Sequence, residues 1–105
     1  MLGLNLRFLR NTKGANKLDG DYALCFEHDE VVQEGDSLGK VFNDISSNLR
    51  LQGYTPYFTG QNDVRISADS VIYNLIDNGY LQMVFDSQRE VNMYVVHVSH
   101  VNPAA

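Results

Sequence analysis

Apolar and polar side chains alternate strictly over residues 2–10, and this pattern constrains the fold more than any other feature of the sequence. The apolar positions on one side of the alternation are Leu2, Leu4, Leu6 and Phe8. A period of two is typical of a β-strand with one buried face. The alternation resumes over residues 21–28, so we expect the two segments to pair as a hairpin, with residues 11–20 as a long polar loop between them.

A helical period follows the acidic residues that end this hairpin. The apolar positions are Leu38, Val41, Phe42, Ile45 and Leu49, whose spacing places them on one face of a helix. Asp36 or Ser37 can cap the first turn through a side-chain oxygen, and Gly53 can end the helix. We therefore predict an amphipathic helix over about residues 37–52.

The second half of the chain holds several β-prone segments, at residues 54–58, 64–66, 80–85 and 91–98. The last of these is apolar on both faces, which favours a central position in the sheet. Residues 69–78 fit two structures: a short helix, or a strand that turns back at Asn78 and Gly79. The β-branched Val71 and Ile72 favour the strand slightly, and both alternatives stay open at this point.

These segments together predict an α+β fold. We expect a single antiparallel β-sheet of five to seven strands with one amphipathic helix, about 37–52, packed on one face, and a second short helix if 69–78 is helical. A chain of 105 residues has the length of one domain, so we assign residues 1–105 to a single domain with a frayed tail at 102–105. The inner surface of the sheet is expected to include Leu4, Leu6, Leu24 and Phe26.

The chain contains one cysteine, Cys25, which excludes an intramolecular disulfide and a cysteine zinc cluster. We expect this side chain to pack as a small apolar group in the second strand. Asn5 and Arg7 interrupt the apolar N-terminal stretch, which is therefore a poor signal peptide. No segment has the roughly 20 consecutive apolar residues of a membrane span, so we expect a cytoplasmic protein without membrane contact.

Charge is distributed unevenly along the chain, which has a formal net charge of −5. Residues 18–36 contain seven acidic residues and no lysine or arginine. Such a surface repels nucleic-acid phosphates and attracts a basic protein. We therefore expect a protein partner with a basic surface and no nucleic acid, and we assign the partner surface to Glu27, Asp29, Glu30 and Glu34.

No catalytic or metal-binding motif emerges from the residue spacings. Residues 35–40 resemble a phosphate-binding loop, but only three residues separate Gly35 from Gly39, and Val41 follows Lys40 where a serine or threonine would hold magnesium. His97 and His100 have an odd spacing, which sends strand side chains to opposite faces. We therefore predict no catalytic residue, no metal and no cofactor, and we favour a protein that is not an enzyme.

Two functions compete for this sequence. The favoured one is a small acidic binding module that acts by protein–protein interaction, as inhibitors, antitoxins and immunity proteins do. The alternative is a small-molecule-binding or enzymatic domain whose pocket lies between the helix and the sheet. Its expected lining is Tyr54, Tyr57, Tyr80, Tyr94 and His97. A homodimer formed through an edge strand is compatible with either function.

Overall fold

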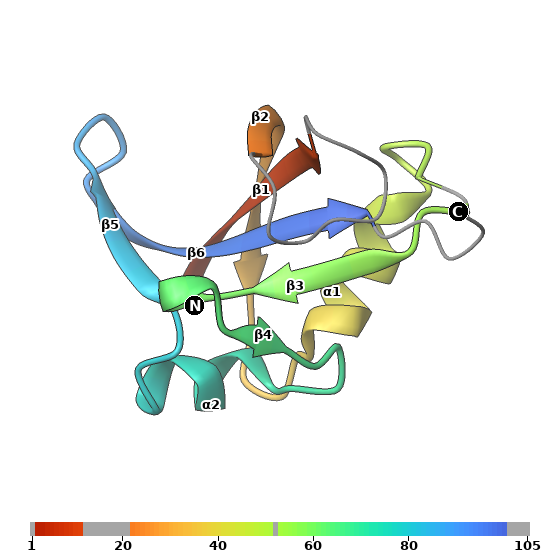
Figure 1. The fold of residues 1–105 in the computed structure, drawn as a ribbon. Coiled ribbons are helices and arrows are strands. Elements are labelled where there is room, and N and C mark those ends of the chain that lie inside the picture. Colours follow the sequence, from red (N-terminus) through yellow and green to blue (C-terminus); the bar gives the residue numbers. More distant parts are fainter. Residues whose placement is uncertain (1, 12–21, 52, 101–105) are drawn as a thin grey trace.

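The chain folds into one open sheet of six strands with two short α-helices among the residues that the structure describes (Figure 1). The computed structural model describes residues 2–11, 22–51 and 53–100. Most of the predicted loop over 11–20 and the predicted tail at 102–105 lie outside these residues. The α+β class predicted from the sequence is confirmed.

The first two strands form the predicted hairpin. Strand β1, Leu2–Asn11, pairs antiparallel with strand β2, Tyr22–Val32. The remaining elements are α1 (Leu38–Ser46), β3 (Pro56–Thr59), a single 3₁₀ turn (Gln61–Asp63), β4 (Arg65–Ile66), α2 (Ile72–Asp77), β5 (Gln82–Asp86) and β6 (Val91–His100). The strand order is β2-β1-β6-β3-β4, and β5 also pairs with β6.

The sheet is mixed, so the prediction of an antiparallel sheet is wrong. β6 runs parallel to β1, with Gly3 opposite Met93 and Phe8 opposite Val98. Its other edge is shared by two antiparallel partners, β5 along residues 91–95 and β3 along residues 97–100. The predicted central position of the last strand is confirmed. An alternation of apolar residues reveals which face of a strand is buried, but neither its neighbour nor the direction of that neighbour.

Helix α1 begins where the sequence predicts and ends earlier. The Ser37 side chain accepts a hydrogen bond from the Lys40 backbone N–H at 3.2 Å, which caps the first turn. The helix ends at Ser46 instead of residue 52. Residues 47–50 form a turn in which Arg50 adopts a left-handed conformation (φ 56°), so the chain leaves the helical path before Gly53.

Residues 72–77 form helix α2, so the slight preference for a strand at 69–78 is wrong. The reason is that Asn78 and Gly79 end a helix here and do not form a hairpin turn. The Gly79 N–H donates to the Ile76 carbonyl at 3.1 Å and the Tyr80 N–H donates to the Leu75 carbonyl at 2.9 Å, with Gly79 at φ 77°. These two bonds define a helix C-terminal cap of the Schellman type, and they compete directly with a hairpin turn at the same residues.

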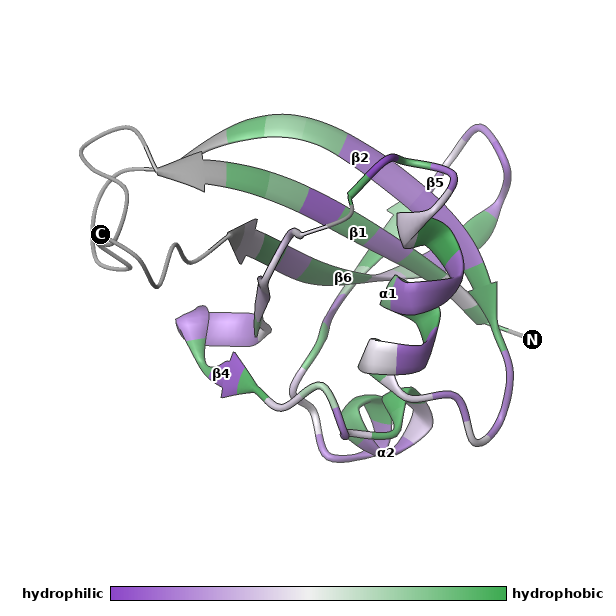
Figure 2. Ribbon diagram, turned by 90° about the vertical axis from the view of Figure 1, so that its right-hand side faces the viewer, coloured by the Kyte–Doolittle hydropathy of each residue, from purple (hydrophilic) through white to green (hydrophobic). Residues whose placement is uncertain are grey.

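The buried core is one cluster that draws on the sheet and on both helices. Its members are Leu4, Leu6, Phe8, Val32, Leu38, Val41, Phe42, Ile45, Phe58, Ile66, Ile72, Leu75, Leu81, Val96 and Val98. The rings of Phe8 on β1 and Phe42 on α1 lie 6.4 Å apart, measured between centroids. Figure 2 shows the apolar and polar residues as alternating bands along β1 and β2.

Two residues expected on the inner surface are exposed instead, Leu24 at 53% and Phe26 at 38%. The register slips between Phe8 and Leu9, so that Phe26 faces Phe8 while Leu24 faces Leu9, on the other side of the sheet. Phe26 still stacks on Phe8 with ring centroids 4.4 Å apart. Cys25, expected to be packed, lies exposed at this slip. Among the described residues, no helix has the length and apolar character needed to cross a bilayer.

Candidate functional site

Strand β2 lies at one end of the sheet and carries most of the acidic residues expected to meet a partner. It pairs with β1 alone among the described residues, so its outer edge has no neighbouring strand there. An edge of this kind presents backbone N–H and C=O groups on which another extended chain can pair. At eleven residues β2 is the longest strand of the sheet, and it offers a correspondingly long edge.

The four acidic residues expected at the partner surface occupy different places on this edge. Glu27 and Asp29 lie opposite Arg7 and Asn5 in the register and share one face of the sheet. Glu30 points to the other face, where its Oε1 lies 2.7 Å from Nε2 of His28. Glu34 is exposed in the turn that follows β2. The structure therefore brings Glu27 and Asp29 together, and it does not bring the four carboxylates into one cluster.

A chain of polar contacts holds Glu27 and Asp29 in place. Arg7 Nε donates to Oδ1 of Asn5 at 2.9 Å and lies 3.2 Å from Oε1 of Glu27. Asn5 Nδ2 in turn donates to Oδ1 of Asp29 at 2.7 Å. Asn5 and Arg7 are the polar positions of the alternation in β1, which explains why both side chains lie on the face away from Leu4 and Leu6.

Arg89 completes this network from the far side of β1, where β6 lies. It belongs to the turn between β5 and β6, and its guanidinium binds Oδ2 of Asp29, which lies sixty residues away in the sequence. Arg89 Nε also lies 3.1 Å from Oδ2 of Asp86. The other oxygen of Asp86 accepts the backbone N–H groups of Gln88 at 3.0 Å and Arg89 at 3.2 Å, so the turn is braced from within.

The Asp29 carboxylate is held in its charged form. Partial burial alone would raise the pKa of Asp29, but the hydrogen bonds from Asn5 and Arg89 and the charge of Arg89 outweigh it. The pKa of this carboxyl therefore lies below its usual value. An ionised carboxylate that oriented donors hold in place is a fixed acceptor for a cationic side chain, here Arg89.

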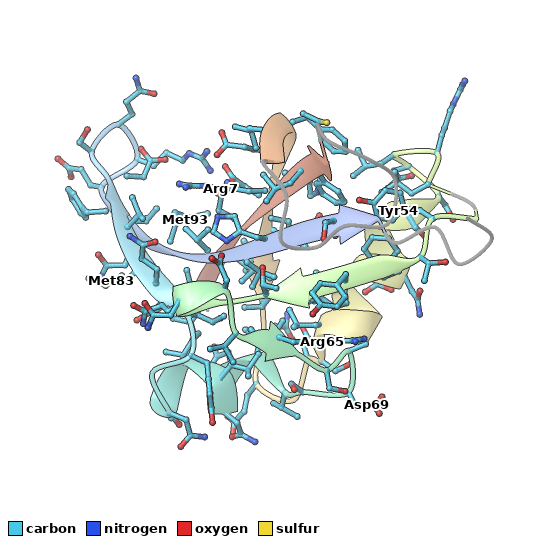
Figure 3. The ribbon with its side chains drawn as sticks, in the orientation of Figure 1. Arg7, Tyr54, Arg65, Asp69, Met83 and Met93 are labelled. Carbon is cyan, nitrogen blue, oxygen red and sulfur yellow. The ribbon has the colours of Figure 1, made fainter. Side chains whose placement is uncertain are left out.

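The face that carries this network is hollowed on both sides of Arg89. A groove of about 550 Å³ is lined by Leu2, Gly3, Asp29, Glu30, Val31, Arg89, Val91, Asn92 and Met93. A smaller hollow of about 220 Å³ is lined by Asn5, Arg7, Glu27, Asp29, Val84, Asp86, Arg89, Met93 and Val95. Figure 3 shows Arg7 and Met93 in the space between β1 and the β5–β6 hairpin. Arg89, Asp29 and Met93 line both hollows, so Arg89 stands between them.

The residues of the alternative, tyrosine-lined pocket lie in several places. Tyr54 lines a groove of about 670 Å³ between α1 and the β3–β4 region, together with Phe42 and Phe58. The register places Tyr57 and His97 on the opposite face of the sheet from Phe58. Of the others, Tyr80 is exposed after α2 and Tyr94 is half-buried against the core.

Two of these side chains have altered acidity. Burial raises the pKa of Tyr54 to about 12. Burial also lowers the pKa of His97, and the nearby charge of Arg7 lowers it further, against a smaller opposing effect of Asp63. Tyr57 lies under the Arg65 guanidinium, 4.4 Å from the ring centroid. None of the described residues form a group of three or more histidine, cysteine, aspartate or glutamate side chains suited to a metal ion.

The cationic side chains of the site, Arg7 and Arg89, were not predicted from the sequence. Asn5 and Arg7 are the polar positions of a clear alternation, so their shared face was visible in the sequence. No local signal connects Arg89 with Asp29, because that contact depends on the pairing of β6 with β1. No family model matches the chain, and no curated protein or solved structure is significantly similar to it.

Proposed function

We propose that the protein is a small cytoplasmic binding module that docks to a basic protein, whose extended segment adds to the edge of β2. The observation that carries this proposal is the outer edge of β2, which has no strand partner among the described residues and carries Glu27, Asp29 and Glu30. Strand addition supplies affinity through main-chain hydrogen bonds and specificity through alternate side chains. This proposal includes inhibitors, antitoxins and immunity proteins, which act by binding another protein.

Exposed apolar side chains on the same strand support a protein partner over a small ion. Val31 is 60% exposed and Leu24 is 53% exposed, and both lie on the face that carries Asp29. Contact with a partner would remove this apolar area from water. The carboxylates between them would attract the partner from a distance and set its register.

Charge also argues against a second copy of this chain as the occupant of the β2 edge. In a twofold antiparallel pairing of β2 with itself, the acidic stretch from Glu27 to Glu30 would lie beside the same stretch of the other copy. Like charges directly opposite each other across a sheet are destabilising. The proposed homodimer is therefore the weaker use of this edge, and a basic strand is the stronger one.

The test uses a short basic peptide of alternating lysine and valine, and a copy with N-methyl groups on alternate amides. We expect the wild-type protein to bind the unmethylated peptide, with an affinity that falls as salt rises, because exposed charges are screened. The N-methylated copy should not bind, because it cannot donate the main-chain hydrogen bonds of strand addition. Isothermal titration calorimetry measures both.

A matched pair of triple variants locates the binding surface. Glu27→Lys, Glu30→Lys and Glu34→Lys together should lower the affinity at least about tenfold, since each reversal turns an attraction into a repulsion. The control is a triple variant in and near the helices, Asp44→Lys, Asp69→Lys and Asp77→Lys, which changes the net charge equally. Equal losses in the two triple variants, or binding of the N-methylated peptide, would contradict the proposal.

The groove beside Tyr54 supports the alternative function, the binding of a small molecule. Its lining includes the buried Phe42 and Phe58 and the exposed Lys40 and Asp69, a combination of apolar and polar side chains that is typical of ligand sites. Tyr54 and Asp69 both belong to this lining, and Figure 3 shows them well apart from each other. Nuclear magnetic resonance with a library of aromatic fragments tests it. Shifts confined to these residues would favour the alternative, and a library without hits would remove it.

A further inference from the structure

Arg89 makes an unusual connection, because it reaches from the β5–β6 turn across β1 to a carboxylate on the edge strand. Its guanidinium binds Oδ2 of Asp29, and Oδ1 of Asp29 accepts a hydrogen bond from Asn5. Arg89 is itself more than half exposed, at 58% of its side-chain area, so it covers the site without being buried there. An exposed side chain of this kind can leave Asp29 at little cost to the fold.

The surface around Asp29 has the chemistry of a site for an arginine side chain. Asp29 supplies an ionised, oriented carboxylate, which suits the planar guanidinium. The lining of the adjoining groove, of about 550 Å³, includes the apolar side chains of Val31 and Val91. Such a lining suits the aliphatic stem of arginine, which packs along apolar surface while its head stays polar. Val31 and Val91 are exposed, at 60% and 41%, so these side chains are not covered by other described parts of the chain.

The position of Asp29 on β2 connects this site with the proposed strand addition. Side chains of a strand added to the β2 edge would alternate between the two faces of the sheet. Those on the face of Asp29 would come close to its carboxylate, because directly paired residues of neighbouring strands lie within reach of each other. Asp29 therefore lies between an internal arginine on one side and the partner's strand on the other.

We infer that the Asp29 groove receives an arginine side chain of the basic partner strand, and that Arg89 occupies this site in the free protein as an internal competitor. This inference rests on the proposed addition of a strand to β2. Arg89 and the partner arginine both need Oδ2 of Asp29, because Oδ1 accepts from Asn5, so the partner displaces Arg89. The β5–β6 turn then supplies an autoinhibitory contact, which lowers the affinity for strands with an arginine at this register and leaves the affinity for other strands unchanged.

The experiment uses the basic peptide with a central arginine and the same peptide with citrulline, which is neutral and nearly isosteric, in that position. Arg89→Ala should bind the arginine peptide about fivefold more tightly than wild type, because the competing ion pair is an exposed one of modest strength. The same variant should bind the citrulline peptide as wild type does. Arg50→Ala, which removes an exposed arginine beyond α1, controls for the loss of one positive charge.

Asp29→Asn provides the complementary variant. It should remove the preference for arginine over citrulline while leaving citrulline binding in place. Thermal unfolding of Arg89→Ala and Asp29→Asn checks that both fold. If Arg89→Ala binds the arginine peptide no more tightly than wild type, or tightens both peptides equally, the inference is wrong. Strand addition itself stands in that case, provided that N-methylation still abolishes binding. If no peptide binds wild type, both proposals fail.

Discussion

Two glycines allow a sharp test of how rigid the neighbouring atoms are. A Cβ atom added at Gly60 would overlap the Tyr80 backbone carbonyl oxygen and lie 2.8 Å from Cδ1 of Ile66. A Cβ atom added at Gly3 would overlap the sulfur of Met93 and lie 3.1 Å from its Cε. The overlaps are similar in extent, but the first is with backbone and the second with the end of a flexible side chain.

The Tyr80 carbonyl oxygen cannot move away, because it accepts the Gln61 backbone N–H at 2.8 Å. Overpacking costs about 1–3 kcal/mol, and overlap with a fixed carbonyl oxygen places Gly60→Ala at the upper end of that range. Replacing glycine by alanine returns about 0.4–1 kcal/mol through the unfolded chain. We therefore expect Gly60→Ala to lower the free energy of unfolding by about 2 kcal/mol. Moving Met93 off its preferred rotamer costs about 0.5–1.5 kcal/mol, so Gly3→Ala should fall within about 1 kcal/mol of wild type.

Urea denaturation followed by circular dichroism measures both changes. With a slope of about 1–3 kcal/mol per molar, the midpoint for Gly60→Ala should fall by roughly 1 M. Met93→Ala should remove any cost of Gly3→Ala in a double-mutant cycle, because it removes the overlapping atoms. A Gly3→Ala variant that loses as much stability as Gly60→Ala would refute the reasoning, since the two neighbours would then be equally rigid.

Two further predictions concern acidity and the second helix. The pKa of His97 is lowered in the folded protein, so the unfolded chain binds the extra proton first as pH falls. The free energy of unfolding should therefore decline below about pH 6.5, and His97→Gln should decline less over the same range in urea titrations. Ile72 is fully buried on α2, so Ile72→Ala should cost about 2–5 kcal/mol in the same assay. Ile76→Ala should cost clearly less, because Ile76 is only partly buried, and equal costs would contradict this difference in burial.

The parts of the fold that local patterns encode were predictable from the sequence. The alternation in residues 2–10 identified Leu4, Leu6 and Phe8, which are all buried in β1. The cap at Ser37 was also visible, because a serine oxygen next to free backbone donors is a local arrangement. The helical spacing after it indicated α1, although not its early end at Ser46.

Features that depend on partners distant in sequence were not predictable. No pattern within β1 or β6 indicates that the two strands run parallel to each other. The Arg89–Asp29 contact follows from that pairing, and so it could not be foreseen either. At Asn78 and Gly79 the local signal was strong but ambiguous, because the same pair can turn a hairpin or cap a helix.

The central place of β6 has a consequence for the way this chain is made. β6 follows every other described strand in sequence, yet β1, β3 and β5 all pair with it. During synthesis one edge of β1 has no strand partner until the residues of β6 have been added. Pairing two strands that lie this far apart in sequence slows folding. The unpaired edge of β1 is therefore open to aggregation while the segments between β1 and β6 are being made, and chaperones that hold apolar strands have their longest opportunity then.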